Sequence, residues 1–400
     1  MKKEKILDSI SSILILFTFI LYYGYNSLKY GSISVYYIPI FALFAISIIK
    51  FLVLGKIKIG NWKNLWWYLL FLIYGCLSVI WSINISFSIT VLIRVFVCFI
   101  FIFDLTIYID SDKKIKNVML FYIIGLIFMI TRLLLFESGR RYYYGDVIGF
   151  YRNSIAHSLD FGIIFLFYFF SKDKKKIYIL LMLVFFYFIY KTGSRKGFLF
   201  PILFITIVLL LSTGKNIKKI LKNIIIVCGI IIAIMAILFS NELFKKRMTE
   251  LFQSFQGKNV EDESVIEREY YRKEAIYIFS QNPILGNGIF GFAAYMASIG
   301  YSHIAYCHSN WFELLSTLGL VGFLIYYRQY FRIVKKAISF FKSNNVETML
   351  PLVAISLLFV FEYGVVTYYD IHIQTAILIM YMMLYYYERN FDNESNKKNI

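Results

Sequence analysis

The stretch Leu180–Tyr190 reads L-L-M-L-V-F-F-Y-F-I-Y and contains no charged residue. Its apolar residues do not alternate with polar ones, so it lacks the pattern of a strand in a membrane β-barrel. Comparable runs recur along the whole 400-residue chain, of which 60% is hydrophobic. This content is well above that of soluble domains. The sequence therefore predicts an all-α, polytopic membrane protein.

About twelve apolar runs are long enough to be read as transmembrane helices. We place them at residues 6–24, 33–54, 65–82, 87–108, 117–135, 156–171, 177–191, 197–212, 223–240, 309–327, 349–367 and 371–387. Residues 1–240 would then hold nine spans, residues 241–307 one long polar loop with a short amphipathic helix, and residues 308–400 three spans and a tail.

Lysines cluster in alternate loops of this arrangement. They include Lys50, Lys56, Lys58, Lys63, Lys113, Lys114, Lys116, Lys172, Lys174, Lys175, Lys176, Lys215, Lys218, Lys219, Lys222, Lys335, Lys336 and Lys342, with Arg332 beside them. By the positive-inside rule these loops and both termini are cytoplasmic, and the long loop is extracytoplasmic. The net charge of +18 is then an orientation signal that also attracts anionic lipid, and no nucleic-acid partner is predicted.

Other function classes are disfavoured. The four cysteines have neither metal-ligand spacing nor a disulfide pattern. They are Cys76, Cys98, Cys228 and Cys307. No P-loop or dinucleotide-binding turn is present, so we predict no cofactor and no metal. The N-terminal Met1–Lys5 stretch precedes an apolar run without a cleavage site, which predicts a signal anchor.

Several cations fall in loops that this topology places outside. They are Arg140, Arg141, Arg152, Lys191, Arg195 and Lys196. Short outward loops usually avoid such charge, which suggests an anionic ligand at the outer leaflet. Alternatively, cations at span ends reach lipid headgroups.

Arg94 lies within a predicted span, in V-L-I-R-V-F. An unpaired cation there costs roughly 2.5 to 3.5 kcal/mol. It therefore needs either a structural partner or a polar cavity with a substrate. Asp104, Asp160 and Glu362 are the candidate partners.

The long loop carries a second group of cations. Ser264 and Glu267 form a capping box, which predicts a helix from Val265 to about Ser280. Arg268 and Arg272 are four residues apart and share one face of that helix, where they could bind one anion. An exposed, salt-bridged helix with Glu267, Glu269 and Glu274 is the alternative. The glycines at 286, 288 and 291 predict a turn that redirects the chain.

His308 precedes the tenth span, with Asn310 and Glu313 close behind it. An unperturbed histidine has a pKa of about 6.5, so His308 is a candidate general base. An interfacial polar residue is the alternative, and His303 is the rival base. His157 and His372 lie near span ends and are interpreted as structural.

Three motifs in this order resemble the O-antigen polymerase and O-antigen ligase family of bacterial integral-membrane glycosyltransferases. They are the T-G-S-R turn at Thr192–Arg195, Arg268 followed by P-I-L-G-N-G at Pro283–Gly288, and H-S-N-W-F-E-L-L at His308–Leu315 with Gly319 and Gly322. Relatives commonly have Leu where this chain has Phe312 and an aromatic residue where it has Arg272. The segment F-Y-R-N-S lacks the proline that relatives carry beside the position of Asn153.

The resemblance implies a metal-independent, inverting transfer of glycan from undecaprenyl diphosphate to an acceptor hydroxyl outside the plasma membrane. Arg195, Arg268 and Arg272 would bind the diphosphate and His308 would be catalytic. Arg94, Arg152, Asn153, Asn310 and Glu313 are further candidate substrate contacts. Besides the lipid-linked oligosaccharide and membrane lipid, other polysaccharide-assembly proteins are implied partners.

Three functions are compatible with these residues, and we favour the first of them. The first is a polymerase of O-antigen or capsule repeat units, and the second is a ligase that transfers finished glycan to lipid A-core. The third is a flippase of lipid-linked oligosaccharide, which would need cations along a central cavity. The long extracytoplasmic loop favours an enzyme.

Overall fold

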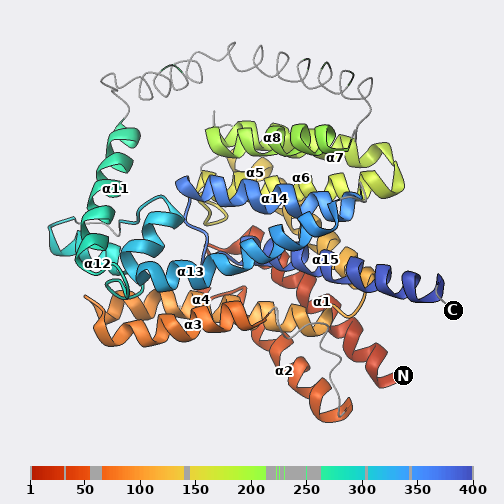
Figure 1. Cartoon of the computed structure of the whole chain (residues 1–400), viewed down its shortest axis with the longest axis horizontal. Helices are drawn as coiled ribbons and strands as arrows, with labels where there is room; N and C mark the ends of the chain where they lie inside the picture. Colours follow the sequence, from red (N-terminus) through yellow and green to blue (C-terminus); the bar gives the residue numbers. More distant parts are fainter. Residues whose placement is uncertain are drawn as a thin grey trace.

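One helix, α15 (Ile371–Lys398), runs through the centre of the bundle of helices in the computed structural model (Figure 1). Every residue from Ile371 to Leu384 is buried. A helix that is buried on all sides has to be enclosed by other helices. The neighbours of α15 therefore determine the arrangement of the fold.

The structure describes residues 2–30, 33–54, 65–138, 145–212, 263–301, 305–341 and 345–398, together with the single residues 222, 225, 229 and 249. The helices before the predicted polar loop are α1 (Lys2–Tyr25), α2 (Tyr37–Leu54), α3 (Leu65–Ser78), α4 (Ile85–Tyr108), α5 (Asp112–Glu137), α6 (Arg152–Asp173), α7 (Lys176–Thr192) and α8 (Arg195–Leu211). Those within and after it, besides α15, are α11 (Glu263–Gln281), α12 (Gly291–Ser298), α13 (Asn310–Ser339) and α14 (Val346–Phe361). The remaining described elements are the antiparallel strands β1 (Lys29–Tyr30) and β2 (Ile33–Ser34), which pair Lys29 with Ser34, and the short helices η2 (Val79–Trp81) and η4 (Glu362–Gly364).

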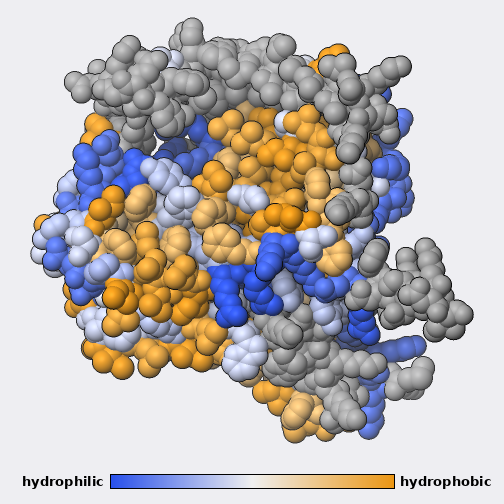
Figure 2. Space-filling view, viewed as in Figure 1, coloured by the Kyte–Doolittle hydropathy of each residue, from blue (hydrophilic) through white to orange (hydrophobic). Residues whose placement is uncertain are grey.

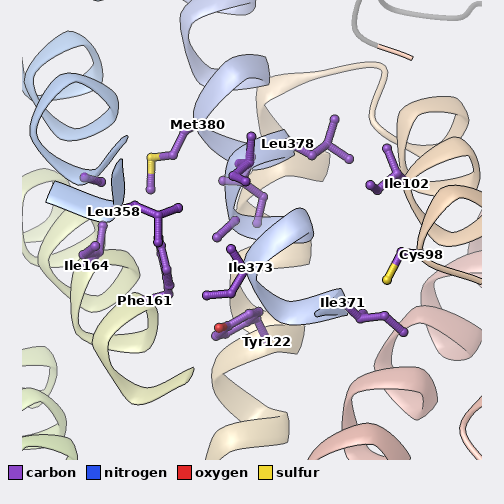
Figure 3. Packing of buried hydrophobic residues seen from close by; sticks show 14 of the residues in the cluster. Cys98, Ile102, Tyr122, Phe161, Ile164, Leu358, Ile371, Ile373, Leu378 and Met380 are labelled. Carbon is purple, nitrogen blue, oxygen red and sulfur yellow. The ribbon is translucent and has the colours of Figure 1, made fainter. Parts of the chain in front are cut away.

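The core lies between α15 and the helices beside it (Figure 3). Phe161 of α6 and Leu358 of α14 lie on one side of α15, and Cys98 and Ile102 of α4 lie on the other. All four side chains are buried. Because lipid is as apolar as these side chains, close packing rather than exclusion from water holds such helices together.

The predicted spans coincide with helices wherever the structure describes them. Ten of the eleven described spans end within about four residues of a helix end or extend into a longer helix. The predicted span 349–367 is wrong at its end, because α14 stops at Phe361 and an extended segment follows η4. The predicted span 223–240 lies outside the continuously described residues.

Length and apolar composition make five of the described helices able to cross a membrane. They are Lys3–Tyr25, Ile85–Tyr108, Asp112–Glu137, Arg152–Asp173 and Val346–Gly364, and Tyr37–Val53 and Leu65–Trp81 are shorter apolar helices. Large apolar side chains also cover much of the outer surface (Figure 2). The fold is therefore that of an all-α membrane protein, whereas the predicted count of twelve spans stays a prediction.

The two ends of the bundle differ in chemistry. Both chain termini lie at one end, and α11 and α12 lie at the other (Figure 1). At the end that holds the N-terminus, Asp8 of α1 pairs with Lys50 of α2 and Lys114 of α5, each at 2.7 Å. Two of the lysines predicted to be cytoplasmic, Lys50 and Lys114, are thus held at the end opposite α11.

A second, smaller core joins α11 and α12 to the bundle. Tyr271, Ile278, Phe292 and Met296 are buried against one another, together with Cys307 just before α13. The helix predicted from Val265 to about Ser280 is confirmed as α11, although it begins at Glu263. This core holds α11 at a fixed position above the start of α13.

The glycines of the P-I-L-G-N-G segment have a packing role. Gly286 has φ +74° and lies against α13, where a Cβ would come within 2.4 Å of the backbone nitrogen of Gly319. Gly319 itself has φ +63°, which interrupts the helical backbone of α13. The freed amide of Leu320 donates to the Pro283 carbonyl at 2.9 Å. The turn predicted at the P-I-L-G-N-G segment therefore also forms the contact between that segment and α13.

We expect Gly286→Ala to destabilise the protein strongly, because the new methyl group must displace backbone atoms as well as occupy a positive φ. Gly300→Ala is the matched control, since Gly300 has φ +99° with nothing within 4 Å. Thermal unfolding in detergent should show a loss of about 1 to 2 kcal/mol for the control. Gly286→Ala should lose at least about 1 kcal/mol more. Equal melting temperatures would contradict the packing role.

Candidate functional site

The Thr192–Arg195 turn positions the first cation. Gly193 ends α7 with φ +64°, a conformation that glycine adopts without strain. The Ser194 hydroxyl then accepts a hydrogen bond from the Gly197 amide at 3.3 Å and caps α8. Arg195 is consequently the first residue of α8, at the end of the bundle that carries α11.

Two further cations converge on η4 from different helices. Lys196 of α8 donates to the Gly364 carbonyl at 2.8 Å. Arg272 of α11 donates to the Tyr363 hydroxyl at 3.1 Å, and its guanidinium lies 5.4 Å from the centre of that ring. Lys196 also lies within electrostatic range of Arg268, Arg272 and Arg195. We call these four residues the cation cluster, and it contains all three predicted diphosphate ligands.

His308 is held in a constrained loop beside the cation cluster. Its backbone has φ +53°, which is unusual for a residue with a side chain. Its ring stacks on Tyr271 with centres 6.1 Å apart and planes 5° apart, and it contacts Tyr306 at 4.0 Å. Glu313 accepts a hydrogen bond from the Cys307 amide at 2.9 Å. Glu313 therefore braces the loop that presents the imidazole.

The charge state of His308 follows from its surroundings. Burial lowers its pKa to about 3, and the positive charges of Arg268 and Lys196 act in the same direction. The imidazole is therefore neutral at physiological pH and can accept a proton. Arg268 and Lys196 of the cation cluster therefore lie within electrostatic range of the imidazole.

A cavity of about 550 Å³ is lined by His308. Arg94 and Asn153 line it as well, so three residues predicted from separate parts of the sequence share one cavity. Its other lining side chains include several aromatic and acidic ones. These are Tyr22, Tyr36, Tyr37, Phe150, Tyr151, Tyr306, Tyr369, Asp146 and Asp370. Aromatic faces with nearby polar groups suit an amphipathic ligand such as a sugar.

None of the three acidic partners considered for Arg94 contacts it. Asp104 accepts a hydrogen bond from Ser47 at 2.7 Å, and Asp160 pairs with His157 at 3.0 Å. Arg94 instead lies 5.6 Å from the centre of the Tyr369 ring. The acidic group that interacts electrostatically with Arg94 is Asp370. Burial raises the pKa of Asp370 to about 7, and the positive charge of Arg94 opposes this rise. The polar-cavity alternative for Arg94 is therefore the one that this arrangement favours.

The third acidic residue, Glu362, has a different set of partners. Its carboxylate accepts hydrogen bonds from the hydroxyls of Tyr327 and Tyr330, each at 2.7 Å, from the Asn310 amide at 3.3 Å, and from Thr367. Asn310 in turn accepts from the Thr367 amide at 3.1 Å. Asn310 and Glu362 are thus structural residues that fasten α13 to residues 362–370. We call this segment the α14–α15 connection.

Other predicted residues lie away from these contacts or outside the described chain. Arg152 opens α6 beside the cavity but does not line it. His372 bonds to the Tyr22 hydroxyl at 3.0 Å, and His157 bonds to Asp160 at 3.0 Å, so both of these histidines have partners within the bundle. Arg140, Arg141 and His303 lie outside the described residues.

Sequence reasoning missed the α14–α15 connection. Gly364, Val365, Tyr369 and Asp370 all line the cavity. Asp370 directly precedes the apolar run that begins at Ile371, and His308 likewise lies just before a predicted span. A search for titratable residues at the outer ends of spans could therefore have found Asp370. Lys196 was assigned only a general outward position, although it is central to the cation cluster. In the described part of the chain, no group of three or more His, Cys, Asp and Glu residues could hold a metal ion.

Residues 160–327 match the sequence profile of the O-antigen ligase family. This match spans all three predicted motifs and confirms the resemblance to the O-antigen polymerase and ligase family. It supports an O-antigen ligase or polymerase type of function, which is that of a membrane glycosyltransferase in a bacterial membrane. A search of curated proteins returned no match to the chain.

We expect Arg268→Gln to raise the pKa of His308 toward its ordinary value, because it removes the positive charge with the larger of the two repelling effects. The chain has four histidines, so ¹³C-labelled histidine gives a spectrum simple enough to titrate. At about pH 5 the His308 imidazole of the parent protein should be neutral, below the ordinary midpoint of about 6.5. Arg272→Gln is the control, since Arg272 contacts Tyr363. An equal rise in both variants would count against the assigned geometry.

Glu362→Ala should destabilise the protein by about 3 kcal/mol or more, because it leaves several buried donors without their acceptor. Glu347→Ala, in the first turn of the preceding helix α14, serves as the control. Glu347 pairs with Lys172 at 2.7 Å at the surface, and its loss should cost no more than about 1 kcal/mol. Thermal unfolding of the purified proteins measures both, and similar losses would show that the Glu362 network is unimportant.

Proposed function

We propose that this protein is a surface-polysaccharide polymerase, which transfers a glycan from undecaprenyl diphosphate to a sugar hydroxyl of an acceptor glycan. The observation that carries the proposal is that His308 lines the cavity and also lies within electrostatic range of Arg268 and Lys196 of the cation cluster. The cation cluster suits a diphosphate, and the cavity suits a sugar. A glycosyl transfer needs both, with a proton acceptor between them.

In this proposal the cation cluster stabilises the leaving group. The acceptor oxygen attacks the anomeric carbon, and the bond between that carbon and the diphosphate oxygen breaks with its electron pair. The negative charge that develops on the diphosphate is met by Arg195, Lys196, Arg268 and Arg272. Guanidinium groups bind phosphate oxygens through paired hydrogen bonds, and they take the role that a divalent cation has in other glycosyl transfers.

His308 accepts the proton of the attacking hydroxyl. A pKa of about 3 makes the imidazole a weak base in the empty site. The negative diphosphate would offset the charges of Arg268 and Lys196, which raises the basicity of His308 when the donor is bound. Base strength is thereby linked to the presence of substrate.

The cavity holds the acceptor in this proposal. Arg94, Asn153 and Asp370 provide polar contacts, and the tyrosines provide flat faces for sugar rings. An acceptor hydroxyl that approaches from the cavity reaches the anomeric carbon opposite the diphosphate. The configuration at that carbon is inverted as a result.

The orientation in the membrane follows from the two ends of the bundle. We place α11, α12 and the cation cluster on the extracytoplasmic side, and the lysine-rich end with both termini in the cytoplasm. Lipid-linked donor then reaches the site from the outer leaflet. Other polysaccharide-assembly proteins would supply the donor and receive the polymer.

The grouping of the cations supports an enzyme over a flippase. Two helices far apart in the sequence, α8 and α11, bring them to one end of the bundle beside His308. A flippase would need charges distributed along a path between the two membrane faces.

We expect His308→Ala to abolish polymer in a deletion strain that carries the variant, with carrier translocation intact. Gels of surface glycan should show single repeat units on the final anchor. Long polymer that remains on the lipid carrier would instead identify a ligase. Loss of translocation would identify a flippase and overturn the proposal.

Arg268→Gln should lower kcat/KM for lipid-linked donor by at least about 100-fold, as expected when a charged donor to the leaving group is removed. Lys273→Gln is the matched control on the same helix. Lys273 pairs with Glu269 at 3.2 Å on the exposed face. Turnover of purified enzyme in detergent measures both, and comparable rates would contradict the role of Arg268.

A further inference from the structure

A groove rich in cations lies far from His308, along the C-terminal half of α13. It consists of two adjoining cavities of about 310 and 500 Å³, and Arg332 lines both. Arg328 belongs to the first cavity, and Lys335 and Lys336 belong to the second. We call these four cations, with the aromatic residues beside them, the basic groove. Figure 2 shows hydrophilic surface in the middle of the viewed face, where α13 crosses it, between areas of hydrophobic surface.

The length of α13 sets the depth of the basic groove. At about 1.5 Å per residue, and with the helix interrupted at Gly319, Arg328 lies at most about 27 Å from Asn310 and Lys336 at most about 39 Å from it. The hydrocarbon layer is about 30 Å thick. With the start of α13 at one membrane surface, Arg328 reaches the opposite hydrocarbon boundary. Arg332, Lys335 and Lys336 then lie at the level of the lipid headgroups.

The charges of the basic groove are fixed by aromatic and polar neighbours. The Arg332 guanidinium lies 5.4 Å from the centre of the Tyr381 ring and donates to Gln329 at 3.2 Å. Lys336 pairs with Glu388 at 2.5 Å. Four cations thus face one carboxylate among the residues that line the two cavities. A guanidinium held in this way is prepared for phosphate oxygens.

The wall of the groove is apolar on the side of α3. Trp66, which is 54% exposed, and Leu70 line the first cavity beside Arg328. The neighbouring residues Leu324 and Phe331 of α13 are also exposed. Cations that adjoin apolar surface suit a ligand with a negative head and apolar chains, whereas a free phosphate ion would leave the apolar wall unused.

We propose that the basic groove binds the headgroup of an anionic phospholipid, in the leaflet opposite the cation cluster. The phosphate lies between Arg328 and Arg332, and the acyl chains follow the apolar surface of α3 and α13. Bound lipid would stabilise the folded protein, because it binds a site that exists only when α3, α13 and α15 are assembled. This inference depends on the membrane fold and not on the proposed reaction.

The test is native mass spectrometry of the full-length protein in detergent, with added phosphatidylglycerol or phosphatidylcholine. We expect phosphatidylglycerol to bind and phosphatidylcholine to bind much more weakly. The double variant Arg328→Gln/Arg332→Gln should bind phosphatidylglycerol at least about tenfold more weakly, as removal of two cations near a lipid surface predicts. Arg328→Lys/Arg332→Lys should retain most of the binding, which shows that the fold is intact.

A matched control separates a site from general attraction. Lys175→Gln/Lys176→Gln removes two exposed cations at the start of α7 and should leave lipid binding unchanged. An equal loss in both double variants would show diffuse attraction and overturn the proposal. Displacement of the lipid by millimolar inorganic phosphate would overturn it in favour of a free-anion site. Equal binding of the two lipids would overturn it as well.

Discussion

The hydrogen bonds that hold the α14–α15 connection are the interaction on which the site depends. Side chains from four other helices donate to this segment. Tyr68 of α3 donates to the Tyr368 carbonyl at 2.7 Å, and Cys98 of α4 donates to that of Tyr369 at 3.1 Å. Lys196 of α8 and Arg272 of α11 reach it at η4. Because every one of these helices is tied to the same nine-residue segment, the cations and the cavity keep a fixed relation to each other.

The cations near His308 influence its charge. Arg268 and Lys196 oppose protonation of the imidazole, and Lys196 itself lies within electrostatic range of Arg268, Arg272 and Arg195. Lys196 and Arg272 donate hydrogen bonds to the Gly364 carbonyl and the Tyr363 hydroxyl at η4. In the proposed reaction, a bound diphosphate would offset the repulsion among these cations, and part of its binding energy would appear as increased basicity of His308.

Much of the fold could be predicted from the sequence, because apolar runs mark helices regardless of what they pack against. The start of α8 at Arg195 follows from the local preferences of Gly193 and Ser194 alone. The early end of α14 could not be predicted, since the tyrosines that satisfy Glu362 belong to α13. For Arg94 the three acidic candidates were equal in sequence, and only the neighbours of α4 distinguish Tyr369 and Asp370 from them. Local sequence preferences thus predicted where α8 begins and places Arg195. They could not predict the partners of Glu362 and Arg94, because these partners belong to other helices or to the α14–α15 connection.

The burial of α15 has a consequence for how this protein is made. The ribosome delivers α15 after the helices that enclose it, namely α4, α5, α6, α13 and α14. Those helices therefore enter the bilayer with their inner faces in contact with lipid or with one another in a provisional arrangement. They can adopt their final packing only after α15, the last of the described helices, has inserted between them. Assembly in the membrane is thus completed by the helix at the centre of the bundle. A chain that stops before Ile371 lacks this central helix.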